Sequence, residues 1–239
     1  VSVFPQEVTG QMVKNFLDGG ATISVLARHV GARVVVVDCG VKADFEPFDG
    51  LKIKKVGYGT DNIARGPAMS REQAIKSLEM GIEAFNEEYL NGIDIVATGD
   101  MGIANTTPSS AIIACLTGAD LSRVTGRGTG LNDDGVEKKI EVIKMSLDVN
   151  KPDPSDPIDV LSKVGGFEIG GIAGLCLAAA SKRTPVLVDG FISTAAALIA
   201  CAIEPKVNEY LISSHASTEN GHKIALEKLQ KRAILDLNL

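Results

Sequence analysis

Short apolar runs alternate with helix-like segments along this chain, and that alternation limits its fold more than any other feature. The runs are short and mostly apolar throughout, which is typical of parallel strands covered on both faces. The six runs lie at residues 33–37, 51–56, 93–97, 185–188, 209–212 and 234–237. Helices are expected at 9–29, 71–89, 107–116, 133–147, 169–181, 193–203 and 219–231. The pattern predicts a doubly wound α/β fold with one mainly parallel sheet of about six strands and flanking helices.

Length and charge narrow the class of protein. The 239 residues, 45% of them hydrophobic, are enough for one large α/β domain, and the Pro-rich stretch 152–157 is expected to be a surface loop. A net charge of −6 without dense Lys and Arg clusters argues against a nucleic-acid partner. The longest apolar runs, 172–180 and 194–203, are too short to cross a membrane and predict buried helices. Without an export leader, a cytoplasmic location is expected.

Four of the predicted strands end in polar residues or glycine, at 38–40, 98–100, 189–190 and 213–215. Ligands of open parallel sheets bind beyond the carboxyl ends of the strands, so we expect these four clusters to face one cleft. The alternative is that Asp, Gly and Ser serve there only as turn and cap residues. The four cysteines are widely spaced, and no set of metal-ligand spacing is visible, so reduced thiols and no metal are expected.

The segment 94–110 predicts an anion site. A strand ends at Gly99-Asp100, and a helix is expected to begin with Thr107 as its cap and Pro108 in its first position. Free N–H groups at such a helix start bind phosphate or carboxylate. The segment lacks the lysine of an NTPase phosphate loop and the G-x-G-x-x-G of a dinucleotide-binding enzyme, so neither function is supported.

The glycine-alternating segment 125–130 offers a second anion-binding candidate, because its N–H groups could form a nest. The alternative is a flexible turn. Arg127 is expected to be free to reach a ligand, and Lys139 either extends towards a phosphate or is solvated. Glu168 needs a partner or a raised pKa if it is buried. His222, on a polar helix, is expected to be structural.

Five segments in order resemble nicotinate-nucleotide–dimethylbenzimidazole phosphoribosyltransferases: FPQEVTGQMV (4–13), GDMGIANTT (99–107), GRGTGL (126–131), GGFEI (165–169) and DGFISTAAAL (189–198). The resemblance covers nearly the whole chain. It implies a glycosyltransferase that moves phosphoribose from nicotinate mononucleotide to dimethylbenzimidazole in cobalamin biosynthesis. It also implies a homodimer and no cofactor. The alternative is a catalytically impaired, nucleotide-binding homologue on the same scaffold.

The resemblance also implies site residues. Asp100 would be the acidic catalytic group near the base and ribose, Lys139 and Ser217 would hold the phosphate, and Asp189 would form the cleft floor. The remaining binding residues would be Gly102, Asn105, Thr106, Gly128, Gly190, Phe4 and Gln11, the last two in the base pocket. This chain has Asp100 where the family usually has Glu, and Ala104 where the family usually has Gly. The shorter acidic side chain and the added methyl group are expected to alter the reach of the carboxylate and the geometry of the loop.

The resemblance further implies segments outside these residues. The family's general base is a Glu in an R-L-G-E-G-T-G-like segment after the strand that matches 234–237, which would place it beyond Leu239. Family members are longer at both ends. Residues 1–239 are therefore expected to form a single Rossmann-like α/β domain, with most of the family's small helical domain missing.

Overall fold

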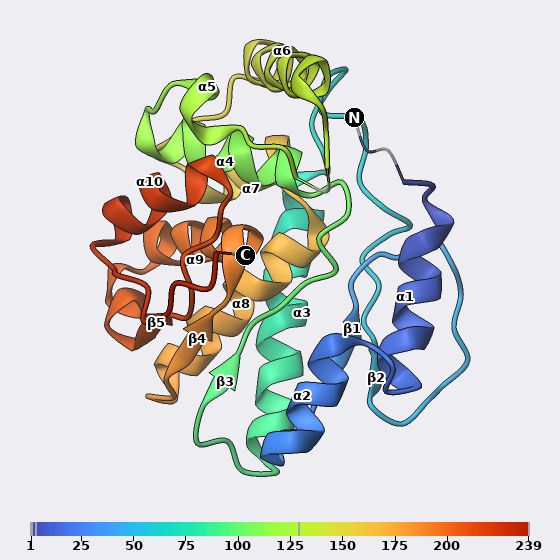
Figure 1. Ribbon diagram of the computed structural model, residues 1–239. Helices are drawn as coiled ribbons and strands as arrows, with labels where there is room; N and C mark the ends of the chain where they lie inside the picture. The colour runs from blue at the N-terminus through green and yellow to red at the C-terminus, as the bar shows by residue number, and fades with distance from the viewer. Residues whose placement is uncertain (1, 3, 129, 239) are drawn as a thin grey trace.

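The computed structural model describes residues 2, 4–128 and 130–238 and has an α/β architecture (Figure 1). Its strands are β1 (Val36–Asp38), β2 (Leu51–Ile53), β3 (Val96–Ala97), β4 (Val186–Val188) and β5 (Leu211–Ser213). Its helices are α1 (Glu7–Leu17), α2 (Thr22–Val30), α3 (Arg71–Tyr89), α4 (Thr106–Thr117), α5 (Leu121–Val124), α6 (Asp133–Asn150), α7 (Pro157–Val164), α8 (Phe167–Ser181), α9 (Gly190–Ile203), the 3-10 helix η1 (Pro205–Tyr210) and α10 (Asn220–Leu229).

The strands form two parallel sheets rather than the one sheet of about six strands that the sequence predicts. β4 lies between β3 and β5, and β1 pairs only with β2 within the described residues. Ion pairs connect the small sheet to α3. Lys52 of β2 pairs with Glu87 at 2.8 Å, and Lys54, just after β2, pairs with Glu83 at 3.0 Å. The prediction of a parallel α/β fold is confirmed, and the prediction of a single sheet is wrong.

The sixth predicted strand, 234–237, contributes only an isolated parallel bridge between His215 and Leu235. The side chains of this segment explain the shortfall. Ile234, Leu235 and Leu237 are each more than half exposed, so burial does not hold the segment in a sheet.

The helix predicted over 9–29 is divided in two, because Gly19 adopts a left-handed conformation with φ of +76°. α1 ends before this glycine and α2 begins after it. The cap predicted for α4 is also wrong. Asn105, not Thr107, precedes the helix, and its side chain makes no capping bond and points elsewhere. A glycine therefore sets the boundary between α1 and α2, and the cap position of α4 lies two residues before the predicted cap.

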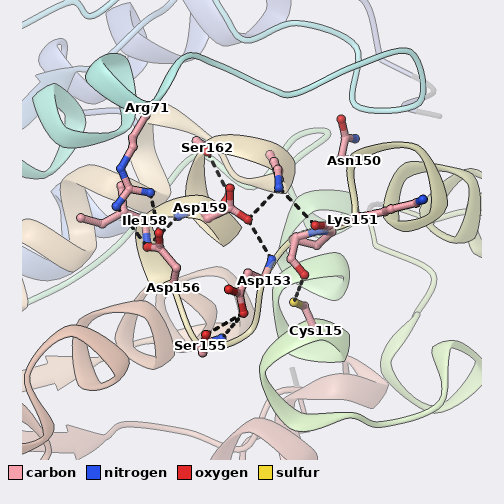
Figure 2. A network of polar contacts seen from close by, with 12 residues as sticks. Arg71, Cys115, Asn150, Lys151, Asp153, Ser155, Asp156, Ile158, Asp159 and Ser162 are labelled. Carbon is pink, nitrogen blue, oxygen red and sulfur yellow. Dashed lines mark hydrogen bonds and ion pairs between the residues drawn. The ribbon is translucent and has the colours of Figure 1, made fainter.

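The Pro-rich stretch 152–157 is a surface loop, as predicted, and it leads into the unpredicted helix α7. Asp156 caps α7 by accepting hydrogen bonds from the N–H groups of Ile158 and Asp159, each at 3.1 Å. Arg71 of α3 donates to both oxygens of the same carboxylate, at 2.6 and 3.3 Å (Figure 2). Lys163 links Asp159, at 2.8 Å, to the carbonyl of Lys151, at 3.1 Å. These contacts fix the loop against the folded domain.

The apolar runs 172–180 and 194–203 lie in α8 and α9, both largely buried, which confirms that prediction. α8 packs closely on α3 because, where the two helices cross, glycines of each helix lie directly against the backbone of the other. A Cβ atom added to Gly81 would lie 1.8 Å from the carbonyl oxygen of Gly171, and one added to Gly174 would lie 2.0 Å from that of Leu78. Within the described chain, no helix is both long and apolar enough to span a membrane.

Substitution at this crossing should destabilise the fold. Gly81→Ala forces backbone apart in a packed core, so the free energy of unfolding should fall by about 3 kcal/mol or more, measured by chemical denaturation. The matched control is Gly10→Ala in α1, whose new Cβ would meet only Ala43 Cβ at an ordinary 3.4 Å. The control should be neutral or stabilising by up to about 1 kcal/mol. Equal effects of the two variants would contradict the close-packing argument.

Candidate functional site

Three of the four polar strand ends meet at one edge of the β3–β4–β5 sheet. The register pairs Ala97 with Leu187 and Val188 with Ser213, so the residues after each strand are neighbours. The N–H of Asp189 donates to Thr98 Oγ1 at 3.3 Å, which ties the turn after β4 to the turn after β3. The fourth cluster belongs to the other sheet and approaches the site through the start of α8, since a Cβ on Gly40 would lie 2.6 Å from the Phe167 ring, and burial and the Glu168 carboxylate raise the pKa of Cys39. Asp38 ends a strand of the other sheet, and its buried carboxylate pairs with Lys55 at 2.7 Å.

Asp100 lies in the turn after β3 and faces the start of α4. Its Oδ1 accepts a hydrogen bond from Asn105 Nδ2 at 3.0 Å. Burial raises the pKa of Asp100, and the nearby Asp189 carboxylate raises it further, while the hydrogen bonds from Asn105 and the Gly102 backbone oppose this. Burial and the Asp100 carboxylate also raise the pKa of Glu168, so Glu168 belongs to the same acidic group.

Lys139 is buried, not solvated, with only 1% of its surface exposed. Its Nζ donates to Thr106 Oγ1 at 2.9 Å and to the Gly126 carbonyl at 3.1 Å. A Cβ atom on Gly128 would lie 2.8 Å from Thr106 Oγ1 and 3.6 Å from Lys139 Nζ, so the glycine loop passes directly over the ammonium group. Burial lowers the pKa of Lys139, and the Glu219 carboxylate raises it in opposition.

Glu219 connects the glycine loop to the segment after β5. Its Oε1 accepts the hydrogen bond of the Gly128 N–H at 2.8 Å, and its own N–H donates to Ser217 Oγ at 3.3 Å. The Ser217 hydroxyl accepts in that bond and therefore keeps its proton for another acceptor. Lys139, Gly128 and Ser217 consequently belong to one connected set of polar groups.

Asp189 holds the turn after β4 to the turn after β5. Its Oδ1 accepts a hydrogen bond from Ser214 and lies 2.8 Å from His215 Nδ1. These contacts engage two of the polar side chains that follow β5. Gly190, with φ of +78°, begins α9 directly after this carboxylate.

The predicted site residues thus fall into two sets. Asp100, Gly102, Asn105, Thr106, Gly128, Lys139, Asp189, Gly190 and Ser217 lie around the carboxyl edge of the larger sheet. Phe4 and Gln11 lie in the N-terminal segment and α1, and no hydrogen bond or ion pair in the described structure joins them to the others. A cavity of about 200 Å³ lies elsewhere, lined by residues of α1 and α2 such as Phe16 and Arg28.

Two other expectations need correction or limits. Arg127 is not free, because it pairs with Asp133 at the start of α6 and donates to the Leu131 carbonyl at 2.9 Å. Thr129, in the predicted nest, lies outside the described residues. Among the residues that are described, no three His, Cys, Asp or Glu side chains gather as a metal site requires, and the four cysteines are unpaired.

A family model described as a phosphoribosyltransferase matches residues 1–239. A relative from Geobacter sulfurreducens named nicotinate-nucleotide–dimethylbenzimidazole phosphoribosyltransferase is 57% identical over 239 residues, which are all of this chain and 68% of the relative. A relative of the same name from Geotalea uraniireducens is 58% identical with the same coverage. The chain belongs to the nicotinate-nucleotide–dimethylbenzimidazole phosphoribosyltransferase family.

The solved structures agree with this membership. The crystal structure of CobT from Thermus thermophilus matches with a TM-score of 0.96 and 41% identity, over all of this chain and 72% of that one. The family resemblance predicted from five separate segments is therefore confirmed, and with it the assignment to a phosphoribosyltransferase class of enzyme.

Sequence reasoning missed several polar groups that connect the predicted site residues. Glu219 and Thr194 were not singled out, and the hydrogen bonds of His222 were not foreseen. His222 is 1% exposed, which agrees with the structural role expected of it, and its pKa is lowered to about 4 by burial and by His215, with Asp189 acting in opposition. No local pattern marks these residues, since their partners lie on other elements.

His222 should make stability depend on pH. Below pH 6.5 the imidazole of His222 binds a proton in the unfolded chain, whereas in the folded chain it stays neutral down to about pH 4. Relative to His222→Gln, the unfolding free energy of the parent chain should therefore fall by up to ~3 kcal/mol as the pH drops from 6.5 to 4. Denaturant titrations at several pH values measure this difference.

The control is His29→Gln, which replaces an exposed imidazole at the end of α2. It should leave the pH dependence of the parent chain unchanged. A His222 variant with the same slope as the parent would show that this imidazole is not held neutral.

Proposed function

We propose that this chain carries the transfer of phosphoribose from nicotinate mononucleotide to dimethylbenzimidazole, with nicotinate and α-ribazole 5'-phosphate as products. The observation that carries the proposal is the buried Lys139 ammonium beneath the Gly128 loop, connected through Glu219 to Ser217. Its relatives' names state the same substrates.

The phosphate of the mononucleotide would bind at this set of groups. Lys139 supplies a positive charge whose hydrogen-bond partners among the described residues are a hydroxyl and a carbonyl, and the Glu219 carboxylate balances that charge only in part. Ser217 has a hydroxyl proton to donate, and the absence of a side chain at Gly128 lets its backbone lie close to Lys139, since a Cβ there would meet Thr106 Oγ1 at 2.8 Å. Anchoring the phosphate fixes the sugar relative to the attacking nitrogen, and such positioning lowers the barrier to transfer.

The reacting carbon would lie near Asp100. Departure of nicotinate neutralises a pyridinium nitrogen, so the leaving group needs little acid assistance, and positive charge develops on the ribose. A carboxylate at that point stabilises the developing charge. The pKa of Asp100 is raised in the free protein, and a cationic ligand would lower it again and keep the group ionised. Asp189 and Gly190 would form the floor of the cleft.

The acceptor must lose its ring proton as it attacks, which calls for a carboxylate base. The family resemblance implies that this base follows the segment 234–237, outside the 239 residues. Phe4 and Gln11 would contribute to the acceptor pocket. A homodimer, a cytoplasmic location and a small helical domain built largely from other residues belong to the same proposal.

The phosphate assignment is tested by Lys139→Met, which keeps the apolar stem and removes the charge. The affinity for nicotinate mononucleotide, measured by calorimetry, should fall ~10–100-fold, because a charged hydrogen bond to phosphate is lost. The affinity for free nicotinate should not change. Lys138→Met is the matched control, since Lys138 is the exposed neighbour on the same helix. An unchanged affinity in the Lys139 variant would overturn the phosphate site.

Turnover separates the proposed enzyme from an impaired, nucleotide-binding homologue. Residues 1–239 should bind the mononucleotide and release nicotinate slowly, and the same residues continued by the C-terminal segment of the Geobacter sulfurreducens relative should release it about 10²–10⁴-fold faster. Chromatography of nicotinate in the presence of dimethylbenzimidazole measures both rates. Binding without release in the extended protein would favour the impaired homologue. Equal rates would contradict the position of the base.

A further inference from the structure

We propose that His222 is a positioning residue that holds the Ser217 backbone and couples it to the turn at Gly190. The inference rests on the proposed function, because it assigns a role to the phosphate and cleft residues of that site. His222 lies in α10, behind Ser217, and is buried beneath the site rather than open to it.

The hydrogen bonds of the imidazole determine its tautomer. The Ser217 N–H donates to His222 Nδ1 at 2.9 Å, so this nitrogen carries no proton. In the neutral ring the proton is then on Nε2, which lies 3.1 Å from Thr194 Oγ1. The Thr194 hydroxyl in turn donates to the Gly190 carbonyl at 2.7 Å. Each donor in this series therefore has one acceptor, and the hydrogen bonds run from Ser217 through His222 and Thr194 to Gly190.

This series joins two segments that the sequence separates widely. Ser217 follows β5, whereas Gly190 follows β4 and begins α9. The strands end beside one another, and His222 and Thr194 supply a side-chain connection between the segments that follow them. The free rotation of the Ser217 segment is reduced before a ligand arrives, which is the physical basis of preorganisation.

The neutral state of the ring is part of this arrangement. A protonated imidazole has donors on both nitrogens and would oppose the Ser217 N–H. Burial and the neighbouring His215 disfavour that proton, as the lowered pKa of His222 shows, while Asp189 favours it. The acceptor offered to Ser217 is therefore maintained at neutral pH.

The inference is tested with two ligands, nicotinate mononucleotide and nicotinate riboside, which lacks the phosphate. His222→Gln places its amide towards Thr194 and leaves the Ser217 N–H without an acceptor, whereas His222→Asn keeps an acceptor near the position of Nδ1. We expect the glutamine variant to bind the mononucleotide ~10-fold or more weakly, with the asparagine variant closer to the parent. Affinity for the riboside should be nearly unchanged in both.

Thr194 provides a second, independent set of variants should substitution of His222 prevent folding. Thr194→Val removes the hydroxyl at equal volume and should weaken mononucleotide binding, while Thr194→Ser should restore it. The matched control is Ser193→Ala, which removes a neighbouring buried hydroxyl that has no hydrogen-bond partner in the described structure and should leave binding unchanged.

The outcomes distinguish the inference from the function on which it rests. A parent chain that binds neither the mononucleotide nor inorganic phosphate would contradict the proposed function itself. Normal binding by the parent together with equal binding by the His222→Gln and Thr194→Val variants would overturn only the positioning role. Equal losses for the mononucleotide and the riboside would also overturn it, because they would show a general structural effect.

Discussion

The parallel pairing of β4 with both β3 and β5 is the constraint on which the rest of the site depends. Because all three strands run in the same direction, Asp100, Asp189 and Ser214 follow their strands at one edge of the sheet. An antiparallel neighbour would carry its polar end to the opposite edge. The buried helix α9 packs against β4, α8 packs against α9, and the glycines of α8 bring it close to α3. Packing therefore decides where the chemistry is assembled.

A second constraint is the cost of burying Lys139. Removing an ammonium group from water is expensive, and here a hydroxyl, a carbonyl and the field of Glu219 offset part of that cost. The arrangement leaves the cation incompletely compensated beside a glycine loop. An arriving phosphate would supply the missing negative charge, so the group that is unfavourable in the free protein becomes favourable on binding.

The sequence predicted local features well where a single segment determined them. The buried helices α8 and α9, the loop at 152–157 and the polar ends of β3, β4 and β5 all follow from local composition. It failed where distant segments compete. The runs at 33–37 and 51–56 resemble those of the main sheet, but their strands pair only with each other among the described residues, and ion pairs connect β2 to α3. Arg127 was expected to be free, but it pairs with Asp133 at the start of α6.

The sequence by itself determined the family, the parallel α/β class and most of the residues proposed to meet the substrate, because motifs and apolar runs are local properties of the chain. Only the tertiary structure decided how these residues are held. Glu219 contacts a glycine 91 positions earlier, and His222 joins Ser217 to Thr194, 28 positions away from the histidine. Such hydrogen bonds depend on strand order and helix packing, which bring together residues that no local pattern relates.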